Sequence, residues 1–307
     1  MLEIPVIDFS LFTKGNVTDR QTVVKQIYQA CHEIGFMYLK NTNISNNLIH
    51  QVFQQSKNFF DLPLAEKQQL AWSDEFSNQG YVGLERERLN PNHPGDLKEG
   101  FNIGKQKPTD RLSPILTASS SPAKNSHILT FYEACTEFAN DVLQAIALAL
   151  ELSKDFFATN HNQKNHTLRL LHYPSLSQSS KPRQVRAGEH SDYGSITLLF
   201  QDEVGGLEVR TASGEWIAAS PISDTVIVNT GDLIERWTNH VFCSTKHRVM
   251  IPNDERVKQS RYSVAFFCHP NDDTEIVCLE SCQRNKSPIY PPILAGEYLL
   301  SCLQATY

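Results

Sequence analysis

The second half of the chain is a succession of short segments rich in β-branched and aromatic residues, with turn signals and no helical stretch between them. The seven segments are TLRLLHYP (167–174), SITLLFQ (195–201), GLEVRT (206–211), EWIAAS (215–220), DTVIVNT (224–230), KHRVMI (246–251) and RYSVAFFCH (261–269). Parallel strands need crossover connections that are usually helices, and no helical pattern is evident between these segments. The pattern therefore predicts an antiparallel β-sandwich or β-barrel, closed by a last helix at roughly 293–305.

The first half of the chain has helical patterns instead. A capping box at residues 18–21, with Thr18 as the cap, opens the first predicted helix, and Gly35 ends it. Ser45 caps a second predicted helix, which Pro63 ends. The longest helical pattern covers about 126–153, and we expect this helix to pack against the sheet.

These patterns predict a mainly β protein with flanking helices. Residues 1–160 are expected to form an N-terminal, mostly helical region, and 161–307 a β core with the C-terminal helix. Between the predicted helices, 72–125 is rich in Asn, Pro, Gly and Ser, which indicates a long irregular segment. Irregular segments of that length in compact proteins are often functional.

Composition narrows the classes of partner. The chain has 307 residues, of which 40% are apolar and 20% are charged, as in globular proteins. A net charge of −6 predicts no nucleic-acid partner, and the lack of any run of 18 apolar residues predicts no membrane span. The N-terminus has no signal-peptide pattern, and the seven cysteines form no CxxC pair. Reduced thiols and a cytoplasmic location are therefore expected.

The segment GEHSDYGSITLLF (188–200) places His190 and Asp192 two positions apart, just before an apolar run. Residues i and i+2 of a strand point the same way, and a charge buried there needs a partner. An H-x-D pair alone is usually explained by ordinary hydrogen bonding. His247, about 55 residues further on, begins another predicted strand. Two histidines and one carboxylate are the ligand set of non-haem Fe(II) oxygenases, and the lack of a cysteine argues against structural zinc.

Arg261 and Ser263 are also two positions apart, in the predicted strand RYSVAFF. A guanidinium matches the two oxygens of a carboxylate, and a hydroxyl on the same face adds a further hydrogen bond. The apolar residues that follow make a fully exposed strand unexpected. The pair is therefore a candidate clamp for a carboxylate ligand.

Together, H-x-D, the distant histidine and R-x-S resemble the 2-oxoglutarate- and Fe(II)-dependent oxygenases of the isopenicillin N synthase-like branch. Further matching segments extend over nearly the whole chain, namely IPVIDFS (4–10), FFDLP (59–63), SNQGY (77–81), DLKEGFNIG (96–104) and NTGDLIERWTNHVFCSTKHRV (229–249). The last of these is the closest, and it brings His247 into register. The resemblance implies a double-stranded β-helix, or jelly roll, flanked by helices.

The resemblance also implies roles for individual residues. His190, Asp192 and His247 would bind Fe(II). Arg261 and Ser263 would hold the distal carboxylate of 2-oxoglutarate, with a hydrogen bond from Tyr173. With O2, the cosubstrate would be converted to succinate and CO2 while a small-molecule substrate is hydroxylated or desaturated. At position 171, where many plant members carry Asn, this chain has leucine.

Two alternatives stay open at this point. An Fe(II) oxidase of the same fold, similar to isopenicillin N synthase or aminocyclopropanecarboxylate oxidase, would take its electrons from the substrate or from ascorbate. A non-catalytic, metal-binding jelly roll would consume no O2. Among these three functions, only the 2-oxoglutarate-dependent oxygenase predicts succinate, and no motif identifies its substrate.

Some other residues have ordinary structural explanations. Tyr81, Glu99 and Phe101 are candidates for substrate contact, but packing is the favoured explanation for them. His240 is expected in a loop rather than as a ligand, and Asn229 is first interpreted as a turn former, like Gly231.

Overall fold

The computed structural model describes residues 3–72, 78–89, 94–104, 127–176, 181–283 and 287–306. The helices are α1 (Ser10–Thr13), α2 (Val17–Glu33), α3 (Asn46–Phe60), α4 (Leu64–Gln68), α6 (His127–Ala149), α7 (Phe156–Asn160), α8 (Asp232–Trp237), α9 (Glu280–Gln283) and α10 (Ala295–Thr306), with a short 3₁₀ helix, η1 (Glu255–Lys258). The strands are β1 (Val6–Asp8), β2 (Phe36–Lys40), β3 (Gly80–Val82), β4 (Glu99–Ile103), β5 (Thr167–Tyr173), β6 (Ala187–His190), β7 (Ile196–Gln201), β8 (Leu207–Arg210), β9 (Trp216–Ala218), β10 (Thr225–Thr230), β11 (His247–Val249), β12 (Arg261–Cys268), β13 (Glu275–Ile276) and β14 (Ile293–Leu294).

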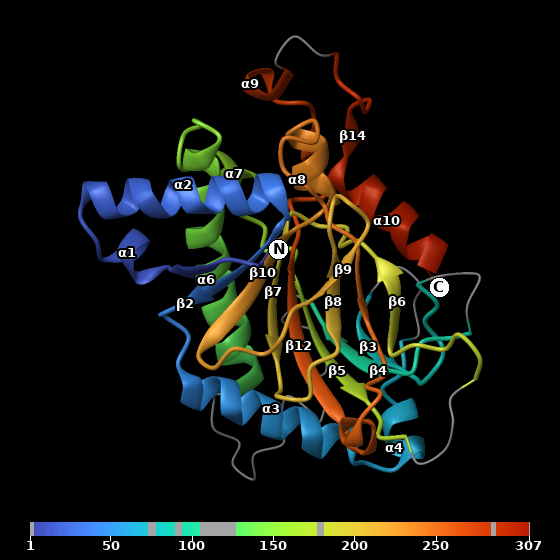
Figure 1. The fold of residues 1–307 in the computed structure, drawn as a ribbon. Coiled ribbons are helices and arrows are strands. Elements are labelled where there is room, and N and C mark those ends of the chain that lie inside the picture. Colours follow the sequence, from blue (N-terminus) through green and yellow to red (C-terminus); the bar gives the residue numbers. More distant parts are fainter. Residues whose placement is uncertain are drawn as a thin grey trace.

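The strands form two main sheets (Figure 1). The large sheet has eight strands in the order β1-β2-β10-β7-β12-β5-β4-β3, and the small sheet has the order β6-β11-β8-β9. Among these described strands, only β1 and β2 pair in parallel. The predicted antiparallel β core with flanking helices is confirmed, and strands from both predicted regions share the large sheet.

The central strands of the large sheet are buried on both faces. In β12, Val264 and Phe266 belong to the core that lies between this sheet and helices α2, α3 and α6. The Phe266 ring lies 5.3 Å from the ring of Tyr132 in α6, and Figure 1 shows α6 crossing behind the strands. The alternate residues, such as Arg261 and Ser263, face the small sheet and line a pocket. This double burial explains why these strands are almost continuously apolar in sequence.

The first long helix begins earlier than its predicted cap. Asn16 is the N-cap of α2: its side-chain oxygen accepts from the Asp19 backbone N–H, and the Asp19 carboxylate accepts from the Asn16 N–H, both at 3.0 Å. The prediction of Thr18 as the cap is wrong, since Thr18 lies within the helix. Asparagine is as good a cap as threonine, so the pattern of residue types did not discriminate between them.

The long segment at 72–125 is not irregular throughout. It contributes β3 and β4 to one edge of the large sheet, where β4 pairs with β5; its other residues lie mostly outside the described ones. Helix α6 ends at Ala149, short of the predicted residue 153, because Glu151 adopts a left-handed conformation with φ of 61°. The predicted last helix corresponds to α10.

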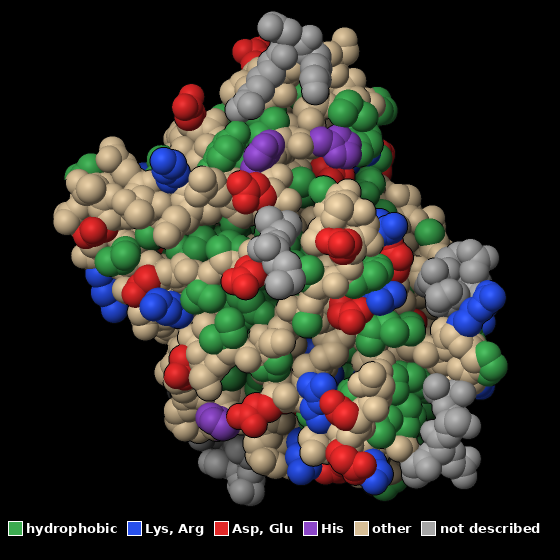
Figure 2. Space-filling view, viewed as in Figure 1, with side chains coloured by type: hydrophobic (Ala, Val, Ile, Leu, Met, Phe, Trp, Pro, Cys, Tyr) green, Lys and Arg blue, Asp and Glu red, His purple; other side chains and the backbone are tan. Residues whose placement is uncertain are grey.

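The face shown in Figure 2 carries acidic and basic side chains intermixed, without a continuous basic area. Among the described residues, no helix combines the length and the apolar character that crossing a membrane requires.

The cap of α2 can be tested by comparing two alanine substitutions. Asn16→Ala should lower the free energy of unfolding by about 1 kcal/mol, because it leaves a helical N–H without its partner. Thr18→Ala, the matched control inside the first turn, should change it by less than about 0.5 kcal/mol. Urea denaturation of both variants measures the difference. A larger loss for Thr18→Ala would contradict the observed cap.

Candidate active site

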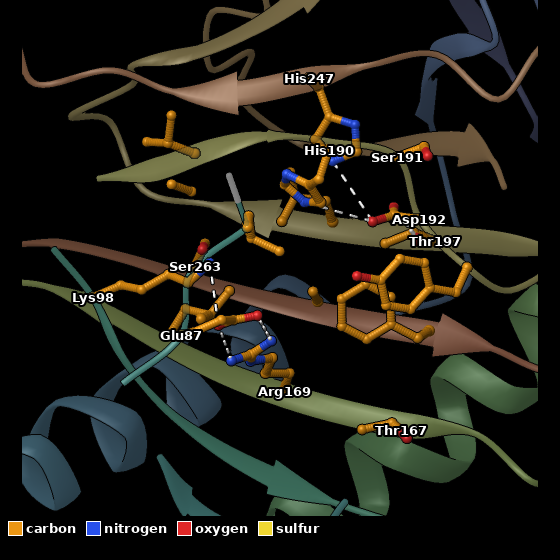
Figure 3. A pocket seen from close by; sticks show the side chains of 18 of the residues that line it. Glu87, Lys98, Thr167, Arg169, His190, Ser191, Asp192, Thr197, His247 and Ser263 are labelled. Carbon is orange, nitrogen blue, oxygen red and sulfur yellow. Dashed lines mark hydrogen bonds and ion pairs between the residues drawn. The ribbon is translucent and has the colours of Figure 1, made fainter. Parts of the chain in front are cut away.

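Three predicted ligand residues converge between the two sheets (Figure 3). His190 ends β6 and His247 begins β11, and the two are direct partners in the antiparallel ladder of the small sheet. Asp192 follows β6 by two residues, and its Oδ1 lies 3.9 Å from His190 Nε2 and 3.6 Å from His247 Nε2. Among the described residues, this is the one group of three such ligand atoms within 4.8 Å of one another.

Hydrogen bonds fix which nitrogen of each imidazole faces the centre. His190 Nδ1 lies 2.8 Å from the Gly188 carbonyl, and His247 Nδ1 lies 3.1 Å from the Thr245 carbonyl. A carbonyl only accepts, so each Nδ1 carries a proton, and in the neutral imidazole Nε2 then presents a lone pair. Burial, and then the neighbouring His247, lower the pKa of His190 to about 3. Two lone pairs and a carboxylate oxygen therefore converge, and such a donor set fits a divalent cation such as Fe(II).

The large sheet holds the carboxylate of Asp192 from the other side. Its Oδ2 accepts from Thr197 Oγ1 in β7 at 2.6 Å and from Asn229 Nδ2 in β10 at 2.7 Å. Oδ1 is thereby left to face the histidines. The interpretation of Asn229 as a turn former is wrong, because it lies within a strand and is buried. Gly231 follows β10 directly as the N-cap of α8, and a Cβ there would lie 2.8 Å from the Asp192 carbonyl oxygen.

The predicted carboxylate clamp is buried in the same pocket. Arg261 is 1% exposed; its Nη1 donates to Ser263 Oγ and its Nη2 to Gln201 Oε1, both at 3.2 Å. The guanidinium carbon lies 4.7 Å from the ring centre of Tyr173, its partner on β5. Within the described part of the chain, Arg261 Nε has no partner and no carboxylate forms an ion pair with the guanidinium. A buried cation in this state fits the carboxylate of a ligand.

Many plant members of the family carry an asparagine at position 171. In this chain the residue is Leu171, and it lines the pocket. Leu171 lies opposite Ser263 on one side of β12, and Gln201 lies opposite it on the other. The amide next to the clamp therefore comes from Gln201, a residue that the sequence motifs did not indicate.

The pocket lining also contains a buried group of charges. Glu87 accepts from Arg169 Nη2 at 2.6 Å and from Nη1 at 3.1 Å, and it pairs with Lys98 at 3.2 Å. Lys98 also pairs with Asp96 at 3.1 Å. Burial alone would raise the pKa of Glu87, but Arg169 and Lys98 hold it at about 2. Two cations and two anions thus balance, and Figure 3 shows Arg169 and Glu87 across the pocket from the triad.

The three candidates for substrate contact, Tyr81, Glu99 and Phe101, lie outside the lining of this pocket. Tyr81 donates to Glu99 at 2.5 Å, and Lys67 pairs with Glu99 at 2.9 Å within the protein interior. Phe101 packs against Phe59 with ring centres 4.8 Å apart. These contacts support packing rather than substrate contact.

His240 lies in the loop after α8. It contacts Tyr290 at 2.7 Å and Glu235 at 3.4 Å, and it is not part of the ligand group.

Comparisons with known proteins agree with this geometry. A family model described as the non-haem dioxygenase in morphine synthesis N-terminal matches residues 4–125, and one for the 2OG-Fe(II) oxygenase superfamily matches 164–270. A 2-oxoglutarate-Fe(II) type oxidoreductase of Emericella nidulans is 32% identical over 99% of this chain and 90% of its own length. A proline hydroxylase of Petromyces alliaceus is 33% identical over the whole of both chains.

The crystal structure of a full-length Neurospora crassa protein in complex with alpha-KG and thymine is also similar. It has a TM-score of 0.88 and 36% identity, covering 99% of this chain and 97% of that one. The jelly-roll fold that the resemblance implied is confirmed by this likeness. The fold, the convergent ligand set and these relatives lead to one conclusion: the chain belongs to the 2OG-Fe(II) oxygenase superfamily, and it is a dioxygenase that uses Fe(II), 2-oxoglutarate and O2.

Proposed function

We propose that His190, Asp192 and His247 are the Fe(II) ligands of this dioxygenase. The convergence of two Nε2 lone pairs and Asp192 Oδ1 supports this assignment, as does the absence of any hydrogen bond among the three atoms. Bound Fe(II), 2-oxoglutarate and O2 together supply the oxidant for a substrate C–H bond, with release of succinate and CO2. Asn229 and Thr197 hold Asp192 in one orientation, so that the same oxygen always faces the histidines.

Arg261, Ser263 and Tyr173 hold the distal carboxylate of 2-oxoglutarate in this proposal. The guanidinium is buried, faces Ser263 Oγ and lacks an ion pair within the described residues. A carboxylate placed there would satisfy its open donor positions and fix how deep the cosubstrate enters. Glu87, Lys98 and Arg169 also line this pocket with their charges paired, and in this proposal the substrate lies beside them.

The polar side chains beside this charge group favour a neutral, amide-bearing heterocycle as the substrate. A pyrimidine base is the simplest example. The single observation that carries this proposal is the pair of amides in the pocket wall, Asn78 and Asn102. Asn102 Nδ2 donates to Asn78 Oδ1 at 2.7 Å, whereas the buried Asn102 Oδ1 has no partner among the described residues. An open acceptor beside an amide donor complements the adjacent N–H and C=O groups of a heterocyclic amide.

The charge balance favours the same class. Arg169 and Lys98 are both paired with Glu87, and Lys98 also with Asp96, so this charge group offers no unpaired cation of the described residues to a substrate carboxylate. An amino acid such as proline would bury its carboxylate there at a cost. The similarity to the Neurospora crassa protein, whose structure holds thymine, agrees with a neutral base. We propose that the enzyme hydroxylates such a base at a carbon attached to the ring, such as the methyl group of thymine.

Thymine and L-proline distinguish these substrate classes directly. With Fe(II), 2-oxoglutarate and O2, thymine should stimulate succinate release and gain one oxygen atom, as mass spectrometry of the product would show. L-Proline should not raise succinate above the substrate-free rate. Asp192→Ala serves as the inactive control. Turnover of proline without turnover of thymine would overturn the proposed substrate class, while leaving the iron and cosubstrate assignments intact.

Asn229 provides a test of the iron site away from the ligands themselves. Asn229→Ala removes one of the two hydrogen bonds that orient Asp192, and Fe(II) affinity should fall about 10- to 100-fold. Thr225→Ala, on the same strand but bonded to the Ile222 carbonyl, is the matched control and should keep the parent affinity. Anaerobic Fe(II) titration measures both. Full affinity in Asn229→Ala, or in Asp192→Ala, would refute the assignment.

Arg261 provides the corresponding test of the cosubstrate clamp. Arg261→Ala removes the charged partner of the distal carboxylate and should raise the KM for 2-oxoglutarate by roughly 10- to 100-fold. Arg256→Ala, which removes an exposed arginine paired with Asp254, is the control and should leave that KM unchanged. Succinate formation against 2-oxoglutarate concentration gives both values. An unchanged KM in Arg261→Ala would remove this residue from the clamp.

A further inference from the structure

A second arginine is fully buried close to the clamp. Arg186 immediately precedes β6 and has an exposed fraction of 0%. Its Nη2 donates to the Gln259 carbonyl at 2.9 Å, whereas its Nε and Nη1 have no partner among the described residues. Arginine stays protonated in proteins, so this is a buried positive charge with open donor positions.

The charges that face Arg186 do not balance it. Arg261 acts on it as a second positive charge, and Asp202 is the one carboxylate of the described residues that acts on it. Asp202 is shared: its oxygens accept from the backbone N–H groups of Tyr262 at 2.5 Å and Val204 at 3.0 Å. Burial raises the pKa of Asp202, and the two arginines oppose that rise. Two cations and at most one anion leave this group with a net positive charge.

The backbone places Arg186 behind the wall that the cosubstrate would touch. Ala187, the next residue, lines the pocket and pairs with Val249 of β11, which also lines it. Gln259, which accepts from Arg186, lies two residues before Arg261. Arg186 itself is not part of the lining, so its charge acts through this wall rather than by contact.

We propose that Arg186 is a positioning residue for 2-oxoglutarate, supplying a second positive charge that the distal carboxylate neutralises together with Arg261. The inference rests on the proposed role of Arg261. It adds an electrostatic contribution from a residue that does not line the pocket. A low-dielectric interior makes such an unbalanced charge effective over several ångströms. Arg186 therefore helps the pocket to select a 2-oxo acid with a charged tail over one with a neutral tail.

Two ligands of equal chain length separate this role from a merely structural one. 2-Oxopentanoate has the same five-carbon 2-oxo acid chain as 2-oxoglutarate but lacks the distal carboxylate. Each is titrated anaerobically into the Fe(II)-loaded protein, and the visible absorption band of the chelate reports binding without turnover. Arg186→Gln should weaken 2-oxoglutarate roughly 10-fold and leave 2-oxopentanoate unchanged. Arg186→Lys, which keeps the charge, should stay close to the parent protein.

If Arg186→Gln does not fold, a second variant that removes a negative charge instead of a positive one can test the proposal. Asp202→Asn removes the neighbouring negative charge, and it should strengthen 2-oxoglutarate relative to 2-oxopentanoate. Equal changes for both ligands in Arg186→Gln, or a loss in Arg186→Lys as large as that in Arg186→Gln, would overturn the proposal. So would an unchanged preference in Asp202→Asn.

Arg261→Ala separates the two levels of the proposal. If it abolishes the preference for 2-oxoglutarate while Arg186→Gln does not, the clamp stands and only the role of Arg186 fails. If Arg261→Ala keeps the preference, the clamp assignment itself fails.

Discussion

The pairing of β6 with β11 is the constraint on which the rest of the site depends. It sets His190 directly opposite His247 in the ladder, and a slip of one residue would turn one imidazole to the other face of the small sheet. Asp192 lies beyond the end of β6, and Asn229 holds it from the large sheet. The ligand set therefore spans both sheets, so a bound cation would also strengthen their packing.

The charged side chains in and around the pocket form two groups that differ in how their charges are balanced. In one group, Arg169 and Lys98 are paired with acidic side chains of the chain itself. In the other, Arg186 and Arg261 are buried without an equal number of anions among the described residues. Desolvation makes an unbalanced buried charge costly, so the second group suits an anionic ligand. We therefore propose that the dianionic cosubstrate binds at the second group and a neutral substrate beside the first.

Alternation along the strands of the large sheet connects stability with the site. The even-numbered residues of β12, such as Phe266, pack against the helices, while Arg261 and Ser263 face the pocket. Both faces of this strand are buried, so its backbone is fixed on two sides. The clamp residues are thereby placed on a rigid element, which favours an accurate fit to a small ligand.

Local patterns in the sequence determined the antiparallel β core, the flanking helices and the spacing of His190, Asp192 and His247, because strand periodicity and motif spacing are properties of contiguous residues. Strands β3 and β4 were not predicted because they are short and form only by pairing at the edge beside β5. The contributions of Asn229, Gln201 and Arg186 were likewise decided by the tertiary structure. Each contacts a group from a distant segment of the chain, and hydrogen bonds and buried charges between distant segments depend on register and packing that no local pattern contains.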